Sequence, residues 1–247
     1  MRADIWLGDV KGLLSSRRTT YSLVIMAVLA LIMAIIVRFS PEDLRIALEA
    51  SAPGSSGLFE YLWVVDVLST ILLLIFVGFG SFAVCDLEDE KATELVYSRA
   101  RSRSEIVLGR LFSSLASLLI VYTIGSCIVA AIGASIVGEL DVSLFILHQV
   151  MVLPMCLFVF SLTFFLSVPL STTALTAIGS FGASLALSFA YTFQLMGGDA
   201  APSDLNPLAL GYRVLVGLPL EFAAGMALLI STLLLAIGFL WFKKKDI

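Results

Sequence analysis

The stretch Leu144-FILHQVMVLPMCLFVFSLTFFLS-Val168 decides the fold of this chain, because its 25 residues contain no Asp, Glu, Lys or Arg. A helix crosses the ~30 Å hydrocarbon core of a bilayer in about 20 residues, so this run is long enough to span a membrane. Five more apolar runs occur in the 247 residues. We therefore predict an all-α integral membrane protein, a single transmembrane domain over residues 1–247, with six spans at about 21–38, 61–85, 107–137, 144–168, 172–194 and 219–242.

The composition agrees with this class. Sixty per cent of the residues are hydrophobic and the mean hydropathy is +1.04, which leaves little room for a soluble domain. The three cysteines, Cys85, Cys127 and Cys156, lie far apart in or beside predicted spans, without CxxC or His/Cys ligand spacing. We interpret them as small apolar packing residues.

The basic residues are distributed unequally between the two predicted faces of the membrane. With six spans, only Arg38, Arg45 and Arg213 of the fifteen Lys and Arg residues lie on the face opposite the two termini. Cytoplasmic loops carry an excess of Lys and Arg. The pattern therefore predicts a multi-pass protein of the cell (cytoplasmic) membrane with both termini in the cytoplasm.

The segment before the first span has an amphipathic pattern. Trp6, Val10, Leu13 and Leu14 recur at helical spacing, and polar residues lie mostly on the other side. Such a helix lies in the membrane interface, so we expect an interfacial elbow helix over residues 1–19. A simple anchor without a mechanical role fits the same pattern.

The cytoplasmic loop over residues 86–106 carries two helix-start signals. Asp86 or Asp89 can cap a short helix that runs to about Ser98, and Ser102-x-x-Glu105 matches a capping box directly before an apolar run. The third span is therefore expected to begin while the chain is still in the cytoplasm. The apolar pair Leu95-Val96 needs a surface to cover it, either the bilayer or a partner protein. The alternative is a solvated loop whose arginines only fix the orientation.

The same loop resembles the membrane subunits of type-2 ABC (ATP-binding cassette) transporters. In that family an acidic helix ends in a Gly-Thr-Leu-like step, a Pro-x-Ser-Arg-like turn follows, and Gly-Lys opens the third span. The matching positions are Glu88 and Glu90, Thr93 and Leu95, Ser102 and Arg103, and Gly109 and Arg110. Ala92 replaces the usual glycine, Ala100 or Arg101 stands at the usual proline, and the spacing is about one residue short.

Two further segments carry the resemblance. Phe242-KKKD-Ile247 looks like the basic-Asp ending of the family, and Asn206-Pro207 followed by Tyr212-Arg213 resembles an Asn-Pro…Arg segment of some members. The resemblance extends over the whole chain in topology and over about forty residues in motif.

The resemblance implies an ABC permease subunit, often an exporter, that pairs with a second permease subunit and with two separate ATPase subunits. The loop then contains a coupling helix that docks on the ATPase. Leu95 and Val96 would supply apolar docking, Glu88 and Glu90 polar contacts, and Arg103 with Arg110 a fixed hinge to the third span. Thr93, Ser102 and Gly109 complete the coupling segment. The expected partners are these subunits and membrane lipid, with no nucleic acid.

The chain lacks the motifs of an enzyme that acts by itself. No GxxxxGK[ST] and no HExxH occur, and the glycines before Asp199 do not complete a GxGD motif. We expect no enzymatic activity and no cofactor in this chain, and ATP is expected to bind the partner subunit.

Ionisable residues within spans are the remaining candidates for a functional site. Asp66, about one and a half turns inside the second span, is a weak candidate for the translocation path, or an interfacial acid solvated from outside. His148 is a ligand or proton relay only as a minor alternative. The runner-up functions are an ion-coupled secondary transporter and a non-transporting membrane scaffold. A secondary transporter would usually show internal repeats and polar residues near the midplane, whereas this sequence shows no convincing repeat and the centres of its spans are nearly free of ionisable groups.

Overall fold

Helices form all the regular structure in the part of the chain that the computed structural model describes. That part comprises residues 10–15, 17–39, 103–136, 142–170, 172–196, 205–215 and 218–244. The elements are α2 (Arg17–Phe39), α7 (Arg103–Ile136), α8 (Val142–Leu170), α9 (Thr173–Met196), the 3-10 helix η1 (Pro207–Ala209), α10 (Leu210–Leu215) and α11 (Glu221–Lys244).

Within these residues, five helices are long and apolar enough to cross a membrane: α2, α7, α8, α9 and α11. They correspond to five of the six apolar runs in the sequence. The remaining run, the predicted second span at residues 61–85, lies outside the described residues. The protein is therefore a helical bundle consistent with a multi-pass membrane protein.

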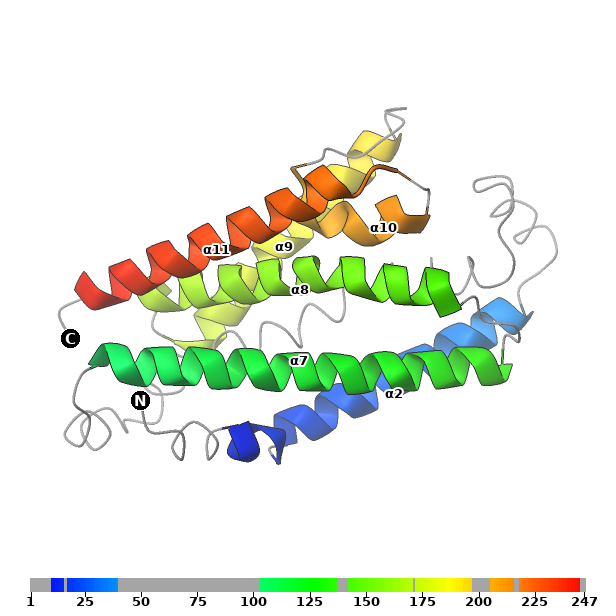
Figure 1. Ribbon diagram of the computed structural model, residues 1–247, viewed down its shortest axis with the longest axis horizontal. Coiled ribbons are helices and arrows are strands. Elements are labelled where there is room, and N and C mark those ends of the chain that lie inside the picture. Colours follow the sequence, from blue (N-terminus) through cyan, green and yellow to red (C-terminus); the bar gives the residue numbers. More distant parts are fainter. Residues whose placement is uncertain are drawn as a thin grey trace.

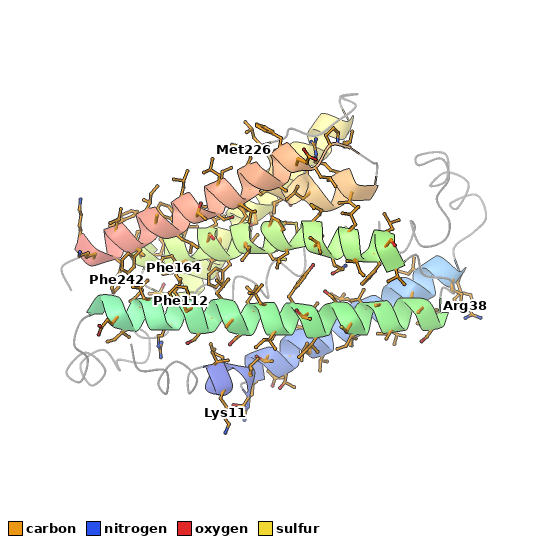
Figure 2. All side chains as sticks on the ribbon, viewed as in Figure 1. Lys11, Arg38, Phe112, Phe164, Met226 and Phe242 are labelled. Carbon is orange, nitrogen blue, oxygen red and sulfur yellow. The ribbon has the colours of Figure 1, made fainter. Side chains whose placement is uncertain are left out.

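Helices α2 and α7 pack side by side and run in the same direction (Figure 1). Gly125 of α7 lies against Met26 of α2, so closely that a Cβ at this glycine would overlap the methionine side chain. Eleven residues further along α7, the carbonyl of Ile136 accepts a 3.2 Å hydrogen bond from Nη1 of Arg38 in the last turn of α2. The Arg38 cation thus lies at the negative end of the α7 dipole, where it is favourable. Figure 2 shows Arg38 at this shared end of the pair.

Helices α8 and α11 form the second closely packed pair (Figure 1). Small side chains let two membrane helices approach closely. The buried residues of α11 are mostly small: Ala223, Ala227, Ser231, Gly238 and Phe242. At Gly238 the α11 backbone reaches the Phe164 ring of α8, and Phe242 lies buried near the same aromatic ring (Figure 2). One turn away, the rings of Phe165 and Trp241 are 5.8 Å apart.

Helices α8 and α9 are antiparallel neighbours, as the short connection between them predicts. Only residues 171 and 172 separate the two helices, and the amide of Thr172 donates a 2.8 Å hydrogen bond to the Leu170 carbonyl in the turn. Thr176, Ser180 and Ser184, spaced by four on α9, are fully buried. Ala130 and Ala134 of α7 are also four residues apart. Ala134 is exposed, however, so this pair does not form a packed small-residue face.

The segment that precedes α11 is inside the bundle. Residues 207–218 contain enough apolar side chains for this segment to suit a position against the membrane. Instead Leu208, Ala209, Leu210 and Val214 are at most 5% exposed, and η1 and α10 pack against α8. The apolar side chains of this segment therefore contact protein.

One side of the bundle carries several exposed basic residues. The first residues of α7 and the last residues of α11 lie at one end of the molecule, and α2 starts on the same side but further along α7 (Figure 1). Lys11, Arg17, Lys243 and Lys244 are exposed there. Residues 10–14 form a short helix at this end, and Thr19 at the start of α2 donates a 2.8 Å hydrogen bond to the Leu13 carbonyl. Residues 1–9 of the expected elbow helix lie outside the described residues.

Candidate functional site

Most of the residues that the sequence analysis singled out lie outside the described residues. They are Asp66, Glu88, Glu90, Thr93, Leu95, Val96 and Ser102.

The three described residues of the expected coupling segment, Arg103, Gly109 and Arg110, belong to one continuous helix. Helix α7 begins at Arg103, directly after the Ser102 that we expect to cap it, and Glu105 lies in its first turn. An acidic residue in the first turn is favourable next to the positive end of the helix dipole. Gly109 is buried, and its carbonyl accepts a 2.9 Å hydrogen bond from the Ser113 hydroxyl. Arg110 is half-buried. These residues are thus held rigidly to the helix that enters the bundle.

A buried polar cluster between α7 and α8 is the most distinctive arrangement of polar side chains in the described residues. Tyr122 and Ser126, four residues apart on α7, face Gln149 of α8. His148, the preceding residue, is only 1% exposed. We call Tyr122, Ser126, His148 and Gln149 the polar cluster. Gln149 lies seven residues into α8, about 10 Å from its first residue, which places the cluster in the end of the bundle opposite Lys11 and Lys244.

Gln149 holds the polar cluster together. Its Oε1 accepts a 2.8 Å hydrogen bond from the Ser126 hydroxyl. The Tyr122 hydroxyl lies 2.6 Å from the Gln149 backbone carbonyl and 3.0 Å from Oε1, so its single proton is shared between two acceptors of one residue. The Gln149 amide nitrogen lies 3.3 Å from Nδ1 of His148. An amide NH2 group can only donate, so Nδ1 is the acceptor in this contact.

Pro154 interrupts the backbone hydrogen bonds of α8 close to its contact with Tyr122 of α7. Proline lacks an N–H group, so the carbonyl four residues earlier, that of Val150, loses its donor within the helix. Prolines are tolerated in membrane helices where neighbouring side chains satisfy backbone groups. The Tyr122 hydroxyl of α7 donates to the backbone carbonyl of Gln149, which is next to the Val150 carbonyl. Helix α7 therefore supports α8 at the point where the backbone hydrogen bonds of α8 are interrupted.

A second polar arrangement fixes the buried segment before α11. Asn206 caps η1, because its Oδ1 accepts a 3.1 Å hydrogen bond from the Leu208 amide. Its Nδ2 donates to the Leu187 carbonyl of α9 at 2.9 Å. Arg213, 3% exposed, donates from Nε and Nη2 to the Pro219 carbonyl at 3.1 and 2.9 Å. Asn206 and Arg213 thus hold this segment to α9 and to the residues directly before α11.

The sequence analysis named His148 but missed Tyr122, Ser126 and Gln149. Their signal was weak, because these three hydrogen-bonding side chains lie in two mainly apolar runs that contain several other Ser and Thr residues. Sequence spacing alone cannot show that residues on different helices meet. Among the described residues, no three His, Cys, Asp or Glu side chains gather as a metal site.

No family model matches the chain, and no curated protein has a significantly similar sequence. The functional argument therefore depends on the residues and geometry given above.

Proposed function

We propose that this protein is the permease subunit of an ATP-driven ABC transporter, an exporter, in which two permease subunits form the translocation path and separate ATPase subunits hydrolyse ATP. The observation that carries the proposal is the resemblance of residues 86–110 to the coupling loop of type-2 ABC permeases, together with the helix start at Arg103.

The length of α7 supports this interpretation. Its 34 residues extend over about 50 Å, about 20 Å more than the hydrocarbon core of a bilayer. A helix of this length continues beyond the membrane at one or both ends. At the Arg103 end, such an extension connects the coupling loop rigidly to the bundle, as transmission of movement requires.

The directions of α2 and α7 support a sixth span. The two helices start at the same end of the bundle, so the chain has to return to that end between Phe39 and Arg103 (Figure 1). The apolar run at residues 61–85 is the segment that we expect to make this crossing. Six spans place both termini on the side with the basic residues, which is the cytoplasm by the positive-inside rule.

In the proposed mechanism, closure of the two ATPase subunits moves the helix over residues 87–98 as a lever. Leu95 and Val96 dock on the ATPase, and Glu88 and Glu90 make polar contacts to it. Arg103 and Arg110 fix the lever to α7. The permease dimer then switches its cavity between the two faces of the membrane.

Purification from the native membrane in mild detergent tests the proposal. We expect an ATPase subunit with a GxxxxGK[ST] motif to co-elute stoichiometrically, as identified by mass spectrometry. The double variant Leu95→Asp, Val96→Asp should lose this subunit, because two charges cannot dock in an apolar surface without a large desolvation cost.

Val142→Asp is the matched control. It makes the same kind of change at an exposed position, at the opposite end of the bundle, and an acid is favourable in the first turn of α8. Absence of any ATPase, even after cross-linking, would contradict the proposal. It would favour a self-sufficient transporter or a scaffold, with Asp66 as the next residue to test.

A further inference from the structure

The contact between α7 and α8 differs from the other helix contacts of the bundle. Among the described α-helices, the pairs whose backbones approach closely and repeatedly are α2 with α7, and α8 with α9, α10 and α11; α7 with α8 is not among them. Side chains make the contact instead. Leu118 and Val121 of α7 belong to the same core cluster as Val152 and Met155 of α8, and the polar cluster adds hydrogen bonds.

Gln149 is the one α8 residue through which these hydrogen bonds pass. Tyr122 and Ser126 both donate to it, so a displacement of Gln149 breaks all three short contacts together. In apolar surroundings each broken hydrogen bond leaves polar groups that find few other partners. The contact is therefore expected to be either fully formed or fully broken.

Pro154 weakens the first half of α8, because it removes the helical hydrogen bond to the Val150 carbonyl. The Val150 carbonyl, which lacks this hydrogen bond, lies one residue after Gln149. The second half of α8, which contains most of its buried residues, begins about one turn later. Kinks in helices occur at such positions. One of the four backbone hydrogen bonds that would join the segment 142–150, which carries Gln149, to the remainder of α8 is missing, so bending at this point is easier than in an uninterrupted helix.

We propose that the polar cluster is a releasable latch between two groups of helices, α2 with α7 on one side and α8 with α9, α10 and α11 on the other. Breaking the hydrogen bonds of Gln149 separates α7 from α8 at the end of the bundle opposite Lys11 and Lys244, with Pro154 as the hinge. The latch is a property of the helix pair itself, so it is independent of whether an ATPase drives the protein.

Cys156 provides the probe for this opening. It is fully buried, belongs to the same core cluster as Tyr122, and lies seven residues after Gln149, hence on the same face of α8. In a chain with Cys85→Ala and Cys127→Ala, its rate of modification by N-ethylmaleimide measures how often α7 and α8 separate. Tyr122→Phe and Ser126→Ala, which delete only a hydroxyl group, should each raise this rate about 3- to 20-fold, the range expected for one hydrogen bond between membrane helices.

Two controls distinguish a latch from general loosening. Thr123→Val deletes a neighbouring hydroxyl on α7 that bonds only to its own helix, at the Leu119 carbonyl, and should leave the rate at Cys156 unchanged. A second chain, with all three cysteines replaced by Ala, carries a Ser231→Cys reporter in the α8–α11 contact. The latch variants should leave the modification rate of this reporter unchanged.

The double variant Tyr122→Phe, Ser126→Ala adds a third criterion. Because both hydroxyls act on Gln149, the two substitutions should have an effect on the Cys156 rate that differs from the product of the single effects. Unchanged Cys156 rates in both single variants would overturn the proposal. An equal increase at the Ser231→Cys reporter would also overturn it, because the whole bundle would then be opening.

Discussion

At the scale of single residues, Gly238 sets how closely α11 approaches α8. A Cβ at this position would lie 3.1 Å from the Phe164 ring and 3.3 Å from the Phe165 backbone. Gly238→Leu should therefore lower the free energy of unfolding by about 1 to 3 kcal/mol, the usual cost of overpacking. Unfolding by SDS titration in mixed micelles measures the change.

Gly225→Leu is the matched control for this prediction. It lies on the same helix, is exposed, and has no atom within 4 Å of its added Cβ. An equal loss of stability in both variants would show that leucine disturbs α11 itself rather than the helix contact.

Asn206 has two separate functions that substitution can resolve. Asn206→Ser keeps an acceptor for the cap of η1 but loses the hydrogen bond to Leu187, whereas Asn206→Ala loses both. A cap and a hydrogen bond between helices are each worth about 1 kcal/mol, so we expect losses of about 1 and about 2 kcal/mol. The same SDS titration measures them. Equal effects of Ser and Ala would contradict a role for the cap.

At the scale of elements, Pro154 should govern how readily α8 bends. In a helix interior proline is about 3 kcal/mol less favourable than alanine, while removal of two buried methylene groups costs about 1.6 kcal/mol. Pro154→Ala should therefore stabilise α8 on balance and slow the modification of Cys156 by N-ethylmaleimide. A faster modification would mean that the cavity left by the ring outweighs the restored hydrogen bond to Val150.

The sequence predicts the described spans well but not their contacts. A run such as residues 144–168 has to become a helix, because backbone groups in lipid have no other partners. Hydropathy does not show which face of that helix packs against other helices, since lipid and the protein interior are both apolar. Ala130 and Ala134 have the same spacing as Ala223 and Ala227, yet Ala134 is exposed and both α11 residues are buried.

The same limit applies to the candidate site. The capping box predicts a helix that starts after Ser102, because a cap acts within one turn of the chain, and α7 is described from Arg103 onward. The polar cluster depends on a contact between Tyr122 and Gln149, 27 residues apart and on different helices. Burial of Leu208, Ala209 and Leu210 likewise depends on contacts with α8 and α9, which local hydropathy cannot reveal.

At the scale of the whole molecule, the direction of the helices can be tested by labelling. Single cysteines at Lys11→Cys and Lys244→Cys should react with a membrane-impermeant maleimide only when the cytoplasmic face is accessible. Val142→Cys and Leu205→Cys, both exposed at the opposite end, should react in intact cells. The native cysteines are replaced by Ala in all four proteins.

Each outcome of this labelling has a definite meaning. Reaction of Lys11→Cys and Lys244→Cys from opposite faces would exclude an even number of crossings between them. Reaction of both from outside would reverse the orientation that the basic residues predict, without changing the number of spans.

The hydrogen bond between Arg38 and Ile136 also has a consequence for biosynthesis. The two residues are 98 positions apart in the chain, and a ribosome adds about 5 to 20 residues per second. Helix α2 is therefore completed roughly 5 to 20 seconds before the far end of α7 exists. During that interval the face with Met26, Ala30 and Ala34 is without its final neighbour, whereas α9 follows α8 almost at once. The membrane insertion machinery, or lipid, has to accommodate this face of the nascent chain until α7 arrives.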